Sequence, residues 1–380
     1  MKEKRLSITV QFCDKKSSCI KNGISAGSAE VPGESVIIME NKRVFLPEAE
    51  KAAFRSEPMD CTLAENEILA QMDWDVLSAG TELAYYKALP NTWGVEDGFP
   101  VYPGYSASGH VAAVGSGVRS LRPGDRILII KASHCLYTKL KESDVIPVPD
   151  GVDMKEAAFA FLSTFPFLSI RKLQVEVGEA VMVAGLGLLG LFAVQIAKLS
   201  GACPVMACDF SPERRALAQK LGADLVFDPR DPDFIQQVKA ATDGKGPEAV
   251  VEVTGHIAGL QQALEYVAFE GRIALLGCTR ISDQNIDFYK YVHRRGVQLI
   301  GCHTHSRPKI ESRPGAWTEP DDCRTYLKLL KAGRLCAAPL IGRIVSPEDA
   351  ESLYAELASA KNPPLGVLFD WNMINQEEKR

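Results

Sequence analysis

The spacing of hydrophobic and polar residues divides the chain into three regions. Up to about Pro149, short β-like runs are separated by turn residues such as those at 115–117 and 123–125. After Asp153, apolar strands alternate with amphipathic helices as far as about Gly301, and the rest of the chain has mixed character. Alternation of strands and helices builds a parallel sheet that helices cover on both faces.

The pattern predicts these elements by residue number. In the first region the expected strands are 36–39, 67–72, 110–114 and 126–130. In the second region we expect strands at 180–184, 204–209, 225–228, 249–253, 272–277 and 298–300, and helices at 154–173, 190–199, 212–221, 233–242, 260–268 and 286–293. In the last region we expect helices at 321–332 and 347–360 and a strand at 366–370.

Composition and charge narrow the possible functions. The chain has 380 residues, 46% of them hydrophobic, and this length favours two folded domains. A formal net charge of -5 offers no basic field, so nucleic acid is not an expected partner. The ten cysteines contain no Cys-x-x-Cys pair, and the charged start lacks an apolar signal segment, so we expect a cytoplasmic protein that does not bind membranes.

A glycine motif occurs within the uncharged stretch 180–197. Gly185, Gly187 and Gly190 form a Gly-x-Gly-x-x-Gly run, with Leu188 and Leu189 between the second and third glycine. An apolar strand precedes the run and an apolar helix follows it, which is the context of a dinucleotide-binding turn rather than of a membrane span. The free N–H groups of the following helix would face the pyrophosphate.

Asp209 follows the next apolar run, nineteen residues after Gly190. A carboxylate there accepts hydrogen bonds from the ribose hydroxyls and repels a 2'-phosphate, so NAD is favoured over NADP. Arg214 and Arg215 follow closely and could hold the 2'-phosphate of NADP instead. Arg214 is one of the candidate cofactor-binding residues. FAD and S-adenosylmethionine use the same kind of turn and stay open as alternatives at this point.

The order of these motifs resembles the medium-chain dehydrogenase/reductase superfamily, over about residues 35–370. The matching landmarks are Ser78-Ala79-Gly80-Thr81-Glu82, Pro103-Gly104-Tyr105-Ser106-Ala107-Ser108-Gly109, Val114-Gly115-Ser116-Gly117-Val118, Pro123-Gly124-Asp125-Arg126, Leu162-Ser163-Thr164, the glycine motif and Leu276-Gly277. The resemblance implies an α/β fold in which a Rossmann doubly wound parallel sheet is inserted into a GroES-like β-barrel catalytic domain. The expected parts are an extension (1–34), the first catalytic part (35–157), the NAD-binding domain (158–301) and the final catalytic part (302–380).

The chain departs from the zinc-dependent members of this family at the metal positions. Those members hold the catalytic zinc with two cysteines and a histidine, and the matching positions here are Ala79, Tyr105 and Ala160. Alanine cannot bind a metal, and one tyrosine makes a poor zinc site. The region of the family's structural zinc has only Cys135. We therefore expect no zinc, and a closer likeness to the zinc-less branch that resembles bacteriochlorophyllide hydroxyethyl dehydrogenases and sugar-linked modules.

The resemblance also implies roles for particular side chains. Thr81 matches a hydroxyl that contacts the substrate oxygen, and capping of the following helix is its alternative role. Tyr105 stands in a vacated metal position, where its phenol would either hydrogen-bond a substrate oxygen or only fill the space of the metal. Glu82 replaces the usual aspartate and is expected to orient the loop rather than to take part in the chemistry. As a base, Tyr105 would need a lowered pKa, and Lys87 is the nearest cation that the sequence offers. The cofactor contacts implied beyond the glycine motif are Thr164, Val253, Thr254, Leu276, Gly277 and Cys278.

These observations favour an NAD-dependent, zinc-independent oxidoreductase that acts on a secondary alcohol or ketone, with a polyol or sugar as a possible substrate. The alternatives are an NADPH-dependent quinone or enone reductase and an inactive NAD-binding protein. The family implies a homodimer paired through the strand expected at 298–300. Two further sites stay open: a metal site at Cys302-His303-Thr304-His305, and substrate contacts from Arg307 and Trp317.

Overall fold

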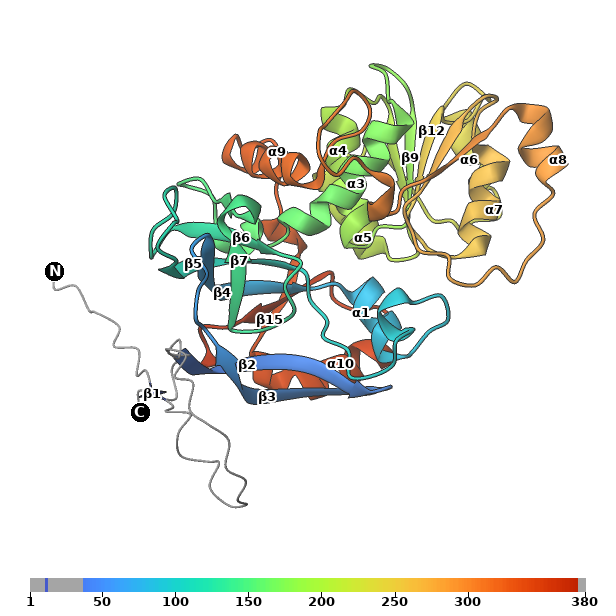
Figure 1. Ribbon diagram of the computed structural model, residues 1–380. Helices are drawn as coiled ribbons and strands as arrows, with labels where there is room; N and C mark the ends of the chain where they lie inside the picture. The colour runs from blue at the N-terminus through green and yellow to red at the C-terminus, as the bar shows by residue number, and fades with distance from the viewer. Residues whose placement is uncertain (1–10, 13–36, 375–380) are drawn as a thin grey trace.

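The computed structural model describes residues 11–12 and 37–374 (Figure 1). The expected extension 1–34 lies outside the described residues except for β1 (Gln11–Phe12), which pairs antiparallel with β2 (Ile37–Glu48). The uncharged stretch 180–197 is divided between a strand and a helix. None of the helices in the described part is long and apolar enough to span a bilayer.

A six-stranded parallel sheet forms one half of the molecule. Its strand order is β11-β10-β9-β12-β13-β14, which is the order of a doubly wound dinucleotide-binding sheet and confirms that expectation. The order reverses between β9 and β12, which lie side by side with Ala184 opposite Glu252. In such sheets ligands bind beyond the carboxyl ends of the strands at this switch point. The strands are β9 (Val181–Ala184), β10 (Val205–Cys208), β11 (Leu225–Phe227), β12 (Ala249–Glu252), β13 (Arg272–Leu275) and β14 (Gln298–Gly301).

Helices cover both faces of this sheet because its central strands are apolar on both sides. Val181 and Val183 join the core under α3 and α4, whereas Met182 and Val250 join a separate core under α6 and α7. Figure 1 shows these two groups of helices on either side of β9 and β12. The helices of this half are α3 (Ala160–Leu173), α4 (Leu188–Leu199), α5 (Pro212–Lys220), α6 (Phe234–Ala240), α7 (Ile257–Tyr266), α8 (Phe288–Tyr291) and α9 (Glu319–Lys331).

The other half is built on a seven-stranded, largely antiparallel sheet. Its order is β15-β16-β4-β5-β6-β8, with β7 also paired to β4. Because β16 pairs antiparallel with β4, the end of the chain completes a sheet that begins near residue 67. The strands are β4 (Glu67–Leu77), β5 (Ser106–Val114), β6 (Arg126–Ile130), β7 (Tyr137–Lys141), β8 (Ile146–Pro147), β15 (Ile341–Val345) and β16 (Gly366–Asp370).

The structure corrects several expected elements. The run at 36–39 is the start of a long hairpin of β2 and β3 (Lys51–Asp60), and α1 (Ala79–Tyr86) was not expected. The helix expected at 154–173 is two helices, α2 (Met154–Ala157) and α3, and the one expected at 347–360 is a 3-10 turn followed by α10 (Ala350–Ser359). The short 3-10 turns are Trp93–Val95, Glu142–Asp144, His293–Arg295, Thr304–Ser306, Ala338–Leu340 and Pro347–Asp349.

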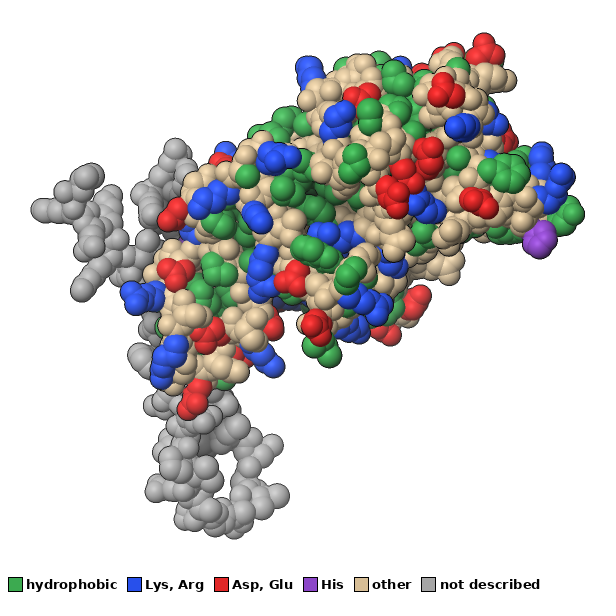
Figure 2. All heavy atoms as spheres, turned by 90° about the horizontal axis from the view of Figure 1, so that it is seen from above, with side chains coloured by type: hydrophobic (Ala, Val, Ile, Leu, Met, Phe, Trp, Pro, Cys, Tyr) green, Lys and Arg blue, Asp and Glu red, His purple; other side chains and the backbone are tan. Residues whose placement is uncertain are grey.

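On the face seen in Figure 2, acidic and basic side chains are interspersed rather than gathered over one element.

Candidate active site

The glycine motif forms the turn between β9 and α4. Gly185 has a φ of +96°, a left-handed conformation that glycine adopts without strain. Gly187 is the N-cap of α4, and Leu188 and Leu189 are its first two residues. A Cβ on Gly190 would lie 1.9 Å from the Gly185 carbonyl oxygen, so only glycine lets the helix approach the strand this closely. The N-terminal N–H groups of α4 are thus presented to an anion at the switch point.

Asp209 lies directly after β10, beside the glycine turn. One of its carboxylate oxygens accepts the Leu186 N–H at 2.8 Å, and the other accepts the Ser211 N–H at 2.9 Å. The carboxylate is therefore fixed in place and keeps lone pairs for further donors. The two arginines considered as phosphate partners are engaged elsewhere: Arg214 donates to the Pro363 carbonyl, and Arg215 bonds the Asp209 carbonyl and Asp228.

The residues expected on the far side of the cofactor lie at the carboxyl ends of β12 and β13. The two strands end at Glu252 and Leu275, before the ends expected at 253 and 277. They are followed by Val253, Thr254, Leu276, Gly277 and Cys278. A Cβ on Gly277 would lie 2.3 Å from the Gly255 nitrogen, so the two loops touch through their backbones.

Sequence reasoning missed Glu252, which anchors this loop. It is fully buried, and one of its oxygens accepts the Thr254 N–H at 2.8 Å. Burial raises its pKa, while the hydrogen bonds from Thr254 oppose that rise. The sequence signal that could have revealed Glu252 is an acidic residue at the end of an otherwise apolar strand.

Three hydroxyl groups meet at a position that the family resemblance assigns to the metal. Ser78 is the N-cap of α1, Thr81 lies in its first turn, and Tyr105 directly precedes β5. The Tyr105 hydroxyl forms a short hydrogen bond with the Ser78 hydroxyl, and Thr81 also interacts with it. The Tyr105 ring packs edge-on against Phe161 of α3, with ring centroids 5.3 Å apart.

The structure opposes the interpretation of Tyr105 as a base. Burial raises the pKa of its phenol above the ordinary value of 10.0, although hydrogen bonds with Ser78 and Thr81 lower it. Lys87, the expected cation, instead donates to the Ala358 carbonyl at 2.8 Å and is exposed. Tyr105 is therefore suited to donate a hydrogen bond at neutral pH and not to accept a proton.

The residues at the former metal positions do not fit a zinc ion. Ala79 begins α1 and Ala160 begins α3, and neither side chain has a donor atom. Across residues 11–12 and 37–374, no group of three or more His, Cys, Asp or Glu side chains is placed to hold a metal. This includes the stretch 302–305, where the His303 and His305 rings contact each other at 4.6 Å between centroids.

Thr164 and Glu82 both lie in fully buried surroundings. The Thr164 hydroxyl donates to the Phe161 carbonyl, and its own carbonyl accepts from Arg307 at 2.7 Å. Arg307 also pairs with Asp322 and is only 7% exposed, so it supports α3 and does not reach a substrate as considered from the sequence. Trp317, the other residue considered, lies under the guanidinium of Arg171.

Glu82 belongs to a buried polar cluster that the sequence did not reveal. One oxygen accepts the Ser78 N–H at 2.8 Å, and the other lies 2.9 Å from the Nε2 atom of His134. The Nδ1 atom of His134 forms a short hydrogen bond with Asp75, and Tyr354 donates to Glu82. The side chains of this cluster are all fully buried: Asp75, Glu82, His134 and Tyr354.

The two halves of the molecule are joined near the candidate site by Arg280. This residue follows β13, and its guanidinium donates to the Asn91 carbonyl at 2.6 Å and to the Thr92 hydroxyl at 3.0 Å. In return the Asn91 amide donates to the Arg280 carbonyl at 2.7 Å. The neighbouring Trp93 is 74% exposed and stands edge-on to His305.

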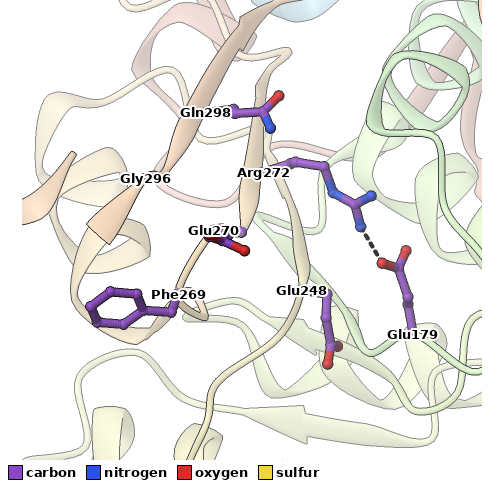
Figure 3. A pocket seen from close by; sticks show the side chains of 8 residues that line it. Glu179, Glu248, Phe269, Glu270, Arg272, Gly296 and Gln298 are labelled. Atoms are coloured by element: carbon purple, nitrogen blue, oxygen red, sulfur yellow. Dashed lines mark hydrogen bonds and ion pairs between the residues drawn. The ribbon is translucent and has the colours of Figure 1, made fainter. Parts of the chain in front are cut away.

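A hollow of the surface lies at the opposite end of the parallel sheet (Figure 3). It is lined by Glu179, Glu248, Phe269, Glu270, Gly271, Arg272, Gly296 and Gln298. These residues stand at or before the amino ends of their strands, and Arg272 pairs with Glu179 at 2.6 Å. Because the glycine turn lies at the carboxyl ends, this hollow is not the dinucleotide site.

Comparisons with known proteins agree with this arrangement. The family model described as alcohol dehydrogenase GroES-like domain matches residues 73–164, and the one described as zinc-binding dehydrogenase matches residues 189–319. Positions 79, 105 and 160, which the resemblance assigns to the metal, all lie within the match to the GroES-like domain.

Individual relatives and solved structures agree with these family models. The chain is similar to L-threonine 3-dehydrogenase of Pyrococcus furiosus, with 32% identity over 64% of this chain and 74% of that protein. It is also similar to sorbitol dehydrogenase of Bacillus subtilis, with 26% identity over 55% of this chain and 70% of that protein. An Escherichia coli oxidoreductase of unknown specificity shares the fold, with a TM-score of 0.76, 20% identity and coverage of 87% of this chain and 99% of that one. The chain thus belongs to the medium-chain dehydrogenase/reductase superfamily and is an alcohol dehydrogenase-like oxidoreductase.

Proposed function

We propose that the protein is an NAD-dependent dehydrogenase that interconverts a secondary alcohol and its ketone without zinc, with a polyol or sugar as substrate. The observation that carries this proposal is the group of three hydroxyls, Ser78, Thr81 and Tyr105, at the position of the metal in zinc-dependent relatives. The names of the relatives, which include sorbitol, D-guloside and L-threonine 3-dehydrogenases, support a substrate with a secondary hydroxyl group.

The residues around the switch point fit a nicotinamide dinucleotide. The glycine turn and the start of α4 would hold its pyrophosphate, Asp209 its adenosine ribose, and the loops after β12 and β13 its nicotinamide half. When bound, the dinucleotide accepts or supplies the hydride at the substrate carbon. We infer that Thr164, Val253, Thr254, Leu276 and Cys278 shape the nicotinamide side of this site.

Tyr105 supplies the polarising group in this proposal. In the direction of ketone reduction, its O–H turns from Ser78 to donate a hydrogen bond to the substrate oxygen as negative charge develops there. Solvent water supplies the proton that completes the alcohol, and it takes up that proton again when the alcohol is oxidised. Because burial raises the pKa of the phenol, Tyr105 keeps its proton at neutral pH and remains a donor. Thr81 interacts with the same hydroxyl and limits the directions in which it points. Glu82 acts through position and not by contact with substrate, because its side chain is fully buried.

Asp209 supports NAD over NADP. Its fixed carboxylate stands beside the glycine turn, where it would repel a 2'-phosphate, and Arg214 and Arg215 bond to other partners. The alternative of an NADPH-dependent quinone or enone reductase would require this carboxylate to tolerate a phosphate.

We also propose that two copies pair through β14. This strand is the last in the parallel sheet, and both of its end residues are exposed, so its outer edge is open to another strand in the described part of the molecule. Light scattering behind a sizing column tests this directly: a mass twice that of the chain supports the dimer, and a mass of one chain rejects it.

Steady-state turnover tests the proposed activity. The protein is assayed with NAD and NADP against a panel of secondary alcohols, polyols and sugars, and in reverse with ketones, quinones and enones. We expect turnover with NAD and a secondary alcohol, and its loss in Tyr105→Phe. Preference for NADPH with an enone would instead support the reductase, and NADH binding without any turnover would support an inactive binding protein.

A further inference from the structure

His134 connects the two chain segments that carry the candidate catalytic hydroxyls. Its backbone N–H donates to the Pro103 carbonyl at 2.8 Å, two residues before Tyr105. Its imidazole packs directly on Gly104, where an added Cβ would lie 2.7 Å from Nδ1. Gly104 has a φ of +101°, so both space and backbone conformation require glycine there.

The other side of the same imidazole reaches the start of α1. Nε2 of His134 lies 2.9 Å from Glu82, and Glu82 accepts the N–H of Ser78 at 2.8 Å. The Ser78 hydroxyl then bonds the Tyr105 hydroxyl. These contacts form a closed ring that runs from the backbone before Tyr105, through His134, Glu82 and Ser78, to the tip of the Tyr105 side chain.

We propose that His134 is a positioning residue, which sets the place and direction of the Tyr105 hydroxyl through this ring. The proposal rests on the proposed function for its catalytic consequence, because Tyr105 is the group that would face the substrate oxygen. A hydroxyl misplaced by about 1 Å can lower a rate about 100-fold, so a link that fixes both ends of this residue matters for turnover.

Charge and burial keep the ring in one arrangement. His134, Glu82 and Asp75 are fully buried, so an imidazolium between two carboxyl groups has partners on both ring nitrogens. Although burial disfavours the charged ring, Asp75 and Glu82 raise the pKa of His134 to about 10. Both imidazole nitrogens therefore carry protons at neutral pH, and the imidazole cannot turn without losing a hydrogen-bond partner.

The chain contains a matched control on the same sheet. His110 of β5 pairs with Asp73 of β4 at 3.2 Å, two residues before Asp75, but its side chain is 33% exposed. Replacing His110 breaks a histidine–aspartate pair in the seven-stranded sheet without touching the ring of contacts around His134. A loss of kcat in both histidine variants would therefore come from damage to the sheet. A loss confined to the His134 variant would come from the ring of contacts around Tyr105.

The experiment compares His134→Gln, Glu82→Gln and His110→Gln in the full-length protein. We expect the first two to lower kcat about 10- to 100-fold, with little change in the KM for the alcohol or in the Kd for NADH. We expect His110→Gln to leave kcat within about twofold of the original, whatever its effect on the melting temperature. If His134→Gln does not fold, Glu82→Gln carries the comparison, because it keeps the side-chain volume and one oxygen for Ser78.

A second readout does not depend on turnover. The ring resonances of ¹³C-labelled tyrosine are recorded, and that of Tyr105 is assigned by its loss in Tyr105→Phe. The Tyr105 signal should shift in the His134 and Glu82 variants and stay in place in the His110 variant. An unchanged Tyr105 signal and unchanged kcat would overturn the proposal and leave His134 as a core residue only. If the signal shifts but no alcohol is oxidised even by the original protein, the proposed function fails while the ring stands.

Discussion

Replacing Asp209 by asparagine should change which dinucleotide the protein binds. In the structure its two carboxylate oxygens accept the N–H groups of Leu186 and Ser211 at 2.8 and 2.9 Å. The amide keeps the shape but loses the negative charge and one acceptor. Hydrogen bonds to a charged group contribute about 1.5–3 kcal/mol, which corresponds to about a 10- to 150-fold weaker NADH complex. NADPH should not weaken in parallel, because the repulsion of its 2'-phosphate is removed.

The assay is fluorescence titration of the original protein and the variant with NADH and NADPH. Asp224→Asn is the matched control, because Asp224 also accepts a backbone N–H, that of Val205, at 2.8 Å, but at the amino end of the same sheet. This control should leave the ratio of the two dissociation constants unchanged. An equal loss of both dinucleotides in Asp209→Asn would refute the reasoning and assign to Asp209 only the support of the glycine turn.

Three further predictions follow from the same geometry. Tyr105→Phe should lower kcat about 100- to 1,000-fold and leave the Kd for NADH unchanged, as measured by steady-state kinetics and titration. Gly190→Ala should destabilise the fold by about 1–3 kcal/mol, because its Cβ would lie 1.9 Å from the Gly185 carbonyl oxygen, whereas Gly187→Ala, with no atom within 4 Å, should keep the melting temperature. Two buried carboxyl groups raise the pKa of His134 from 6.5 to about 10 against the effect of burial. The free energy of unfolding, measured by urea denaturation, should therefore fall as the pH rises through this interval. The fall should be smaller in His134→Gln.

The parallel sheet could be predicted from the sequence because its strands are buried on both faces. The runs 181–184 and 249–251 are wholly buried and continuously apolar, and the helices between such runs have a period near 3.6. The glycine motif marked the turn between the first strand and helix of this sheet. Asp209 could be located in the same way, because the distance from the glycines along the chain reflects one helix and one strand.

The half of the molecule with the antiparallel strands was harder to predict because its elements have mixed burial. Most residues of Lys51–Asp60 are at least partly exposed, so β3 lacks the alternation that marks a strand. The helix Ala79–Tyr86 has eight residues and includes a glycine, which makes it too short for a periodic signal. The buried cluster escaped detection for a different reason. His134 meets Glu82 and Tyr354 only after distant segments of the chain have folded together, and no local pattern records such contacts.

The same limit applies to the protonation state of Tyr105. The resemblance assigns this residue to a metal position of zinc-dependent relatives, but the pKa of its phenol depends on burial by residues from α1 and α3, which no local pattern records. Burial raised the pKa where a base would need it lowered. Of the roles considered from the sequence, the hydrogen bond to a substrate oxygen is the one that the raised pKa favours.

The most direct test of the account is the turnover of metal-stripped protein. The enzyme is dialysed against a strong chelator, its zinc content is measured, and its kcat with NAD and the best secondary alcohol is compared with that of protein supplied with one equivalent of zinc. Because Ala79, Tyr105 and Ala160 offer no zinc site, we predict the same kcat in both samples. Activity that disappears with the metal and returns with one zinc per chain would contradict the account.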